Sequence, residues 1–313
     1  MAETFCVMFA GQSVQEAGMG RQLLKIPAAR KVIERLIPRL GEDLPALLTD
    51  TPDAALALTL NAQRAIHASH LAHFLAYKAA HPELRLDGAI GHSMGIVAAL
   101  VAAEAMSVED SGAFIRARAE AFSKVCKSFG EPMGLAAVST EDFGEVFEAA
   151  AEVPGVSVAL HNTIGRGTIG GSTAALEAFV RKAREEDWPV KVTLLKVEGP
   201  YHTKAFSPCK AALQAALARI EVRPPRVPVF MGTSGRAEND PARIKALLAE
   251  QADSPELHHS AVRAAYAAGC RRFLEIARKP QPVTWLADQL RAQDGQPYPD
   301  VTALAVTTEQ LSG

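Results

Sequence analysis

The chain lacks the features that mark secreted and disulfide-stabilised proteins. Its 313 residues include only four cysteines, which are widely scattered and form no Cys-x-x-Cys pair: Cys6, Cys126, Cys209 and Cys270. This spacing is typical of reduced thiols rather than of a disulfide framework or a zinc site. The amino terminus has no basic stretch followed by a long apolar segment, as a secretory signal would have. We therefore expect a cytoplasmic protein.

Long apolar runs and a strong charge of one sign are also missing. The run 96–103 is followed at once by Glu104, well short of the roughly 18 residues that a membrane helix needs. The formal net charge of −2 gives no basic field that would attract nucleic acid. A hydrophobic content of 48% is enough for a large core. We expect neither a membrane nor a nucleic-acid partner, and look for a small molecule or a protein instead.

The histidines do not form an obvious metal site. His67, His70 and His73 are spaced three residues apart. On a helix, steps of three rotate by about 300° each, so the outer two side chains diverge and suit a single metal poorly. His81 and the pair 258–259 are expected at the surface, from their loop or helix-end context. The sequence thus predicts no metal site.

The most informative segment is Gly91-His92-Ser93-Met94-Gly95. It follows an apolar, strand-like run at 86–90 and precedes an alanine-rich, helix-like run at 96–103. A serine with glycine two residues away on each side, between a strand and a helix, is the nucleophile elbow. The glycines permit a turn so tight that the hydroxyl is presented outward. This pattern predicts an acyl-transfer serine at position 93.

Strands and helices alternate along most of the chain. Expected strands lie at 4–10, 86–90, 227–232 and 272–276, and expected helices at 21–39, 61–80, 96–103 and 209–220. Alternation of this kind indicates a parallel α/β sheet, as in α/β-hydrolases, with sites at the carboxyl ends of strands. The Gly11-Gln12 turn and Ser93 would share that edge. Residues from about 294 onward show no clear periodicity.

The pattern changes between 130 and 198. Expected elements are strands at 134–139, 155–160, 167–170 and 190–197, and helices at 141–151 and 174–186. The order β-α-β-β-α-β is that of the ferredoxin-like unit. We therefore predict a small ferredoxin-like domain (130–198) inserted into a large, discontinuous α/β domain (1–129 and 199–313).

A nucleophilic serine needs a general base. Histidine is the side chain that usually titrates near neutrality. His202 lies in a loop where the inserted domain rejoins the large one. His92 would point away from the neighbouring Ser93 and is expected to pack or to form hydrogen bonds. His202 is therefore the predicted base.

Four motifs follow one another along the chain: Phe9-Ala10-Gly11-Gln12-Ser13-Val14-Gln15, 91–95, Arg116-Ala117-Arg118 and Pro200-Tyr201-His202. Together they resemble the malonyl-CoA:acyl carrier protein transacylase family, which includes the acyltransferases of polyketide synthases. The distances from Ser93 to Arg118, His202 and Gln251 also fit the family. The resemblance covers about residues 4–278.

The resemblance implies a ping-pong reaction. Ser93 would take an acyl group from coenzyme A and pass it to the phosphopantetheine thiol of an acyl carrier protein. No resident cofactor is implied, because coenzyme A is a substrate and the carrier supplies the phosphopantetheine. His202 would be the acid–base group on both half-reactions, oriented by a backbone carbonyl near Gln251. The backbone N–H groups of Gln12 and Met94 would form the oxyanion hole.

The resemblance also implies substrate-binding residues. The fork of Arg118 would match the free carboxylate of a malonyl group, a geometry that lysine cannot reproduce. Gln63 and Asn162 match polar positions that line the family's site, although helix or loop hydrogen bonding would explain them almost as well. Tyr201, beside the base, would shape the acyl pocket, as would Gln251.

Several positions depart from the family pattern. Ile96 replaces the usual Glu or Gln after the elbow, and Ser13 replaces a glycine. Pro255-Glu256-Leu257-His258 stands where the family has Pro-Val-x-Trp, and 277–280 replaces a Gly-Pro-Gly stretch. Tyr201 stands where malonyl-specific members have Ser or Phe. These changes leave the chemistry in place and the exact acyl group open.

Three functions follow from these patterns. The first is a monomeric S-malonyltransferase that serves fatty acid or polyketide synthesis, with malonyl-CoA and an acyl carrier protein as partners. Basic residues such as Arg166, Lys191 and Lys204 would meet the acidic carrier between the domains. The second is a hydrolase that clears acyl groups from carrier proteins, and the third is a non-catalytic subunit that binds a synthase. Arg118 argues against the second, and the presence of both Ser93 and His202 argues against the third.

Overall fold

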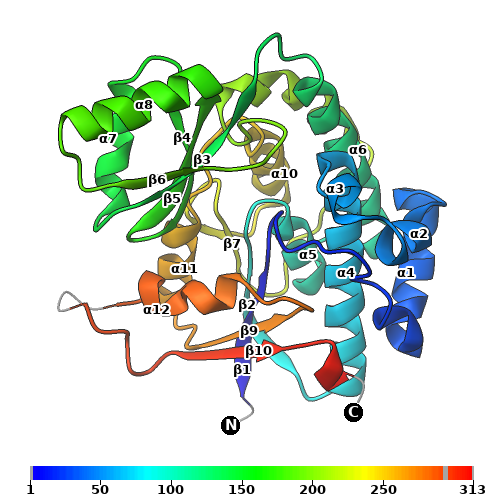
Figure 1. Cartoon of the computed structure of the whole chain (residues 1–313). Helices are drawn as coiled ribbons and strands as arrows, with labels where there is room; N and C mark the ends of the chain where they lie inside the picture. The colour runs from blue at the N-terminus through cyan, green and yellow to red at the C-terminus, as the bar shows by residue number, and fades with distance from the viewer. Residues whose placement is uncertain (1–2, 292–294, 312–313) are drawn as a thin grey trace.

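The computed structural model describes residues 3–291 and 295–311, in which the chain forms two separate β-sheets (Figure 1). The larger sheet has the strand order β10-β9-β1-β2-β7-β8. Every neighbouring pair is parallel except the β7–β8 hairpin at one edge. Its strands are β1 (Thr4–Phe9), β2 (Arg85–Gly91), β7 (Val229–Met231), β8 (Arg236–Glu238), β9 (Arg272–Ile276) and β10 (Thr302–Val306). The predicted α/β class is confirmed.

The central strands are buried on both faces because helices cover the sheet. In β1, the last four residues are all buried, as expected of a parallel strand between two helical layers. Helix α4 packs against α1 and α6 and is buried along most of its length. The helices of this unit are α1 (Pro27–Leu40), α2 (Leu44–Thr49), α3 (Asp53–Leu56), α4 (Thr59–Ala80), α5 (Gly95–Ala102), α6 (Val108–Cys126), α9 (Lys210–Leu217), α10 (Pro241–Glu250), α11 (His258–Ala267) and α12 (Leu286–Gln289).

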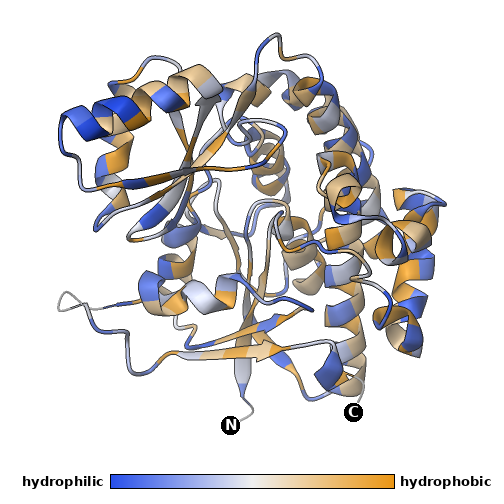
Figure 2. Ribbon diagram, in the orientation of Figure 1, coloured by the Kyte–Doolittle hydropathy of each residue, from blue (hydrophilic) through white to orange (hydrophobic). Residues whose placement is uncertain are grey.

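The smaller sheet is antiparallel, with the strand order β4-β5-β3-β6. Its elements are β3 (Met133–Ser139), α7 (Val146–Ala151), β4 (Ser157–Thr163), β5 (Arg166–Ser172), α8 (Thr173–Glu185) and β6 (Lys191–Leu194). Their order along the chain is that of a ferredoxin-like unit. Helix α8 buries Leu176, Phe179 and Ala183, and Figure 2 shows hydrophilic residues elsewhere on this helix. The domain boundaries at 130 and 198 stay predictions.

Several element predictions need correction. The helix expected at 21–39 is a short 3-10 turn, Leu23–Lys25, followed by α1, because Pro27 suits the first position of a new helix. The strand expected at 190–197 ends at Leu194. The carboxy-terminal region contains β10, which pairs with β9 and extends the large sheet. His258, expected at the surface, is fully buried.

Within residues 3–291 and 295–311, no helix combines the length and the apolar character that crossing a bilayer demands.

Candidate active site

The turn around Ser93 joins β2 to α5 in a strained conformation. Ser93 itself has a φ of +51°, in the left-handed region. A Cβ atom on Gly91 would overlap the backbone of the following turn, and one on Gly95 would overlap the carbonyl oxygens at the end of β1. Both glycines are therefore required by close packing. This is the geometry of a nucleophile elbow, which lifts the serine hydroxyl above the sheet edge.

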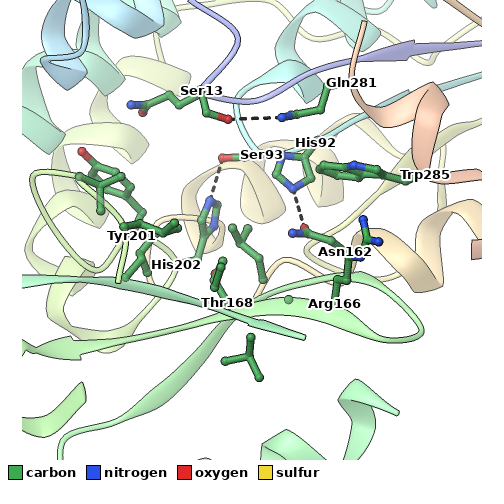
Figure 3. Close-up of a pocket in the computed structure, with 18 of the residues that line it drawn as sticks. Ser13, His92, Ser93, Asn162, Arg166, Thr168, Tyr201, His202, Gln281 and Trp285 are labelled. Carbon is green, nitrogen blue, oxygen red and sulfur yellow. Dashed lines mark hydrogen bonds between the residues drawn. The ribbon is translucent and has the colours of Figure 1, made fainter. Parts of the chain in front are cut away.

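The structure brings Ser93 and His202 together, although 109 residues separate them. The Ser93 Oγ atom lies 2.7 Å from Nε2 of His202. Figure 3 marks this hydrogen bond with a dashed line. His202 also has a left-handed φ of +63°, so its loop is held in a special conformation. A hydroxyl in this contact can transfer its proton to the imidazole when it attacks a carbonyl.

The second ring nitrogen of His202 is fixed by the backbone. Its Nδ1 lies 2.8 Å from the carbonyl oxygen of Gln251, at the end of α10. An acceptor at this position keeps the proton on Nδ1 and leaves Nε2 free to accept from Ser93. Among the residues that the structure describes, this carbonyl and not a carboxylate takes the third position of a triad.

Burial keeps the imidazole of His202 neutral. Loss of solvation lowers its pKa to about 3, and the nearby guanidinium of Arg118 contributes in the same direction. At neutral pH the ring is therefore an available proton acceptor. Protonation during attack is transient, because the same surroundings disfavour the imidazolium.

The backbone N–H groups of Gln12 and Met94 were predicted to form the oxyanion hole, and this assignment stays a prediction. Gln12 follows β1 and Met94 follows Ser93, so both belong to the carboxyl edge of the large sheet. Among the described residues, neither N–H donates to a protein acceptor. The Gly11 turn rests directly on the elbow, since a Cβ on Gly11 would lie 2.6 Å from Nδ1 of His92. Free donors at this edge can stabilise a developing oxyanion.

Arg118 lies behind Ser93 and is not a surface residue. It is 2% exposed, and its Nη2 lies 3.5 Å from Ser93 Oγ. Its other hydrogen-bond partners are neutral: Nη1 donates to Gln63 Oε1 at 2.6 Å, and Nη2 to Gln251 Oε1 at 3.3 Å. Its Nε atom has no partner in the described chain. Burial lowers its pKa to about 10, which leaves it charged at neutral pH.

A cavity of about 390 Å³ lies between the two sheets. Ser93, His202, Tyr201 and Asn162 line it, and Figure 3 shows them facing the same space. Arg118, Gln63 and Gln251 are not part of its lining and lie deeper. Tyr201 is also buried, with its ring stacked on Phe122. The cavity gives a substrate access to the serine from the side of the small sheet.

The elbow histidine contributes packing and a hydrogen bond. Nε2 of His92 lies 2.8 Å from Oδ1 of Asn162, and its ring packs edge-on against His258 and Trp285. Asn162 therefore orients the histidine beside the nucleophile rather than pointing freely into the cavity. Its role in substrate binding stays a prediction.

Most of the remaining residues singled out in the sequence have protein partners of their own, and of these Arg166 also lines the cavity. The three histidines of the 67–73 segment have different hydrogen-bond partners. His67 bonds to Ser111, His70 to the Ala10 carbonyl, and His73 to the Ser69 carbonyl and Thr308. Two of the basic residues expected to meet a carrier are already paired. Arg166 lies 3.8 Å from Asp288, and Lys204 lies 3.4 Å from Asp253.

One site residue was missed from the sequence. Glu256 is fully buried, and its Oε1 accepts a hydrogen bond from the Ser93 N–H at 3.1 Å. It does not contact His202 and is not the acid of a triad. The sequence did contain a hint of this residue. Glu256 lies five positions after Gln251, where the family pattern Pro-Val-x-Trp has a valine.

The fold and the geometry define a class. A serine on an elbow at the edge of a parallel sheet, a histidine oriented through Nδ1, and an inserted ferredoxin-like unit together describe a serine-dependent acyl-transfer protein. Comparison with known families agrees. The model of the acyl transferase domain family matches residues 6–307, and the chain belongs to this family.

Curated relatives extend over most of the chain. The malonyl CoA-acyl carrier protein transacylase of Bacillus subtilis is 29% identical over 272 residues, or 86% of this chain and 85% of the relative. The mitochondrial malonyl-CoA-acyl carrier protein transacylase of Mus musculus is 29% identical over 262 residues, or 80% of this chain and 68% of the relative.

Solved structures share the whole fold. The acyl-carrier-protein S-malonyltransferase of Bartonella henselae superposes with a TM-score of 0.88 at 27% identity, covering 99% of this chain and 98% of that one. The malonyl-CoA:acyl carrier protein transacylase of Xanthomonas oryzae gives 0.85 at 27% identity, covering 95% and 94%.

Proposed function

We propose that the protein transfers a malonyl group, or a closely related acidic acyl group, from coenzyme A to an acyl carrier protein. Attack of Ser93 Oγ on the thioester carbonyl forms the C–O bond while His202 Nε2 takes the hydroxyl proton. Collapse of the tetrahedral intermediate breaks the C–S bond, and His202 returns the proton to the departing thiolate. The carrier's phosphopantetheine thiol then attacks the serine ester by the reverse sequence.

The single observation that carries the acidic acyl group is the buried guanidinium of Arg118. The nearby Glu256 carboxylate favours the charge of this guanidinium but does not hydrogen-bond to it, and all its hydrogen-bond partners are neutral. A buried charge without a directly bonded counter-ion is expensive, so the guanidinium is suited to bind an anion. It lies within reach of the atom that carries the acyl group, at 3.5 Å from Ser93 Oγ. A malonyl carboxylate would replace the contacts with Gln63 and Gln251 by a bidentate pair.

The oxyanion of each intermediate would lie between the N–H groups of Gln12 and Met94. Loss of one such donor typically raises the barrier by about 2.7–4 kcal/mol. Because both are backbone groups, replacing a side chain would not remove them. The names of the relatives support malonyl-CoA and an acyl carrier protein as partners.

The test is an intact-mass assay with malonyl-CoA, with and without a phosphopantetheinylated carrier protein. We expect a malonyl adduct on the wild type, none on Ser93→Ala, and transfer of the adduct when carrier is added. Rapid release of free malonate without a malonylated carrier would favour the hydrolase instead. A panel of acyl-CoAs in the same assay would identify the acyl group.

The proposal includes three further points. The reaction needs no resident cofactor, since coenzyme A is a substrate and the carrier supplies the phosphopantetheine. A monomer suffices, because the site is built from residues of one chain. The cytoplasmic location is supported by the four cysteines, all of which are free thiols in this structure.

A further inference from the structure

Glu256 lies in the segment between α10 and α11, where it is held by its own backbone. Its N–H donates to the Ala159 carbonyl at 2.9 Å, and its carbonyl accepts from the His161 N–H at 2.8 Å, both on β4. The segment thus bridges the two sheets, and the side chain points toward the elbow. Gly232 leaves room for this carboxylate, because a Cβ on that glycine would overlap it.

The two carboxylate oxygens of Glu256 contact the two parts of the site that must stay aligned. Oε1 accepts from the Ser93 N–H at 3.1 Å, and Oε2 accepts from the side-chain amide of Gln251 at 3.3 Å. The same Gln251 amide donates to the Ser93 carbonyl at 3.0 Å, and the Gln251 carbonyl orients His202. One carboxylate therefore connects the nucleophile's turn to the residue that orients the base.

We propose that Glu256 is a positioning residue, which in its ionised form fixes the Ser93 turn relative to Gln251 and thereby aligns Ser93 with His202. This rests on the proposed use of Ser93 as the nucleophile. Glu256 is fully buried and does not line the cavity, so it acts through its neighbours rather than on the substrate. Each of its oxygens accepts a hydrogen bond from an N–H group. A proton on either oxygen would point at one of these N–H groups and break that hydrogen bond.

The surroundings of Glu256 place its ionisation in the neutral range. Burial raises its pKa to about 7, opposed by the bonds from Ser93 and Gln251 and by the charge of Arg118. Arg118 is the cation that acts on it. The histidines of the surrounding elements all have pKa values lowered by burial: His92 at the elbow, His161 on β4, His202 in its loop, and His258 and His259 on α11. A change in Ser93 reactivity near pH 7 would therefore belong to Glu256.

The test measures the reactivity of Ser93 alone. A fluorophosphonate probe phosphonylates an activated serine without malonyl-CoA or carrier, so the result remains readable even if the proposed transfer reaction is wrong. We expect the wild-type labelling rate to rise as the pH passes through 7. Glu256→Gln and Glu256→Val should label about 10- to 100-fold more slowly at pH 8, the scale expected when a reactive group is misplaced.

The pH profile separates positioning from simple structural support. In Glu256→Gln the inflection near pH 7 should disappear, and Glu256→Asp should restore it in part. The matched control is Glu250→Gln, since Glu250 lies nearby at the end of α10 and pairs with Arg243 rather than with the site. It should leave both rate and profile unchanged.

Two results would overturn the proposal. One is a wild-type profile that is flat between pH 6 and 8, a measurement that needs no variant to fold. The other is Glu256→Gln that labels at the wild-type rate with the same inflection. Thermal unfolding of each variant shows whether a slow rate reflects a folded protein.

Discussion

The Nη2 atom of Arg118 lies 3.5 Å from the Oγ atom of Ser93, although one residue lies on α6 and the other at the end of β2. An acyl group esterified to the serine would therefore extend directly past the guanidinium. Arg118 is also stacked over the ring of Phe122, with its Cζ 4.2 Å from the ring centroid. This packing limits the directions in which the guanidinium can move.

Arg118→Ala is expected to change acyl preference rather than abolish chemistry. Malonyl transfer should fall because the carboxylate loses its bidentate partner, a charge-assisted pair worth about 1.5–3 kcal/mol, or roughly 10- to 100-fold. Acetyl transfer should be spared or improved. Arg118→Lys should not restore malonyl transfer, because an ammonium lacks the fork. Rates of Ser93 acylation from malonyl-CoA and acetyl-CoA measure the preference.

The matched control is Arg116→Ala. Arg116 lies on the same helix but is exposed, with its Nε 2.9 Å from Glu120. Its loss should leave both rates unchanged, since exposed pairs contribute little. An Arg118→Ala variant that keeps the wild-type ratio of malonyl to acetyl transfer rates would contradict the role of Arg118 in binding the malonyl carboxylate.

His202→Ala should slow acylation of Ser93 without unfolding the protein. Removing a general base typically costs about 10²- to 10⁴-fold. The fast release of coenzyme A that accompanies ester formation is the quantity to follow. His81→Ala is a suitable control, because His81 is a partly exposed residue beside Glu83. Unaltered coenzyme A release in His202→Ala would remove the histidine from the mechanism.

Local patterns predicted Ser93, and its need for a base pointed to His202. The elbow is visible because its glycines are imposed by backbone packing, which leaves a short, regular motif. The roles of Arg118 and Gln251, and the match of the Ser93–His202 spacing, came from a family resemblance, since no local pattern links residues so far apart in sequence. The structure brings all three to Ser93.

Strand β10 shows why no carboxy-terminal strand was predicted from the sequence. Four of its five residues, Thr302–Ala305, are exposed, so the segment has no alternation of buried and exposed positions. Its place in the sheet depends on backbone pairing with β9, which leaves little trace in the side chains. His258 was misplaced for a related reason. Its burial comes from contacts with His92 and Trp285, which are distant in sequence.

Gly91→Ala is expected to destabilise the protein strongly. A Cβ at this position would overlap the Ile96 N and Gly95 C atoms, which are backbone and cannot move aside. Overpacking of this kind costs about 1–3 kcal/mol and sometimes more. Gly134→Ala is the control, because a Cβ on Gly134 meets nothing within 4 Å. Urea unfolding midpoints should separate the two variants, and equal midpoints would mean that the elbow tolerates a side chain.

Glu275, on β9, is expected to make the stability of the protein depend on pH. It is 1% exposed, and its Oε2 accepts from the N–H groups of Gln281 and Val283 at 2.9 and 3.1 Å. Burial raises its pKa from an ordinary 4.5 to about 8. The folded protein therefore keeps this proton after the unfolded chain has lost it. Its contribution is fully present below pH 4.5 and is lost as the pH rises toward 8.

The variant Glu275→Gln keeps an oxygen for both N–H donors and removes the titration. The free energy of unfolding of the wild type should fall relative to this variant between pH 5 and 8, with a slope of at most about 1.4 kcal/mol per pH unit. Buried histidines with lowered pKa values act in the opposite direction below pH 6.5, but they are common to both proteins and cancel in the difference. Chemical unfolding at several pH values measures that difference. A constant gap across the range would mean that Glu275 is already ionised in the folded protein at pH 5.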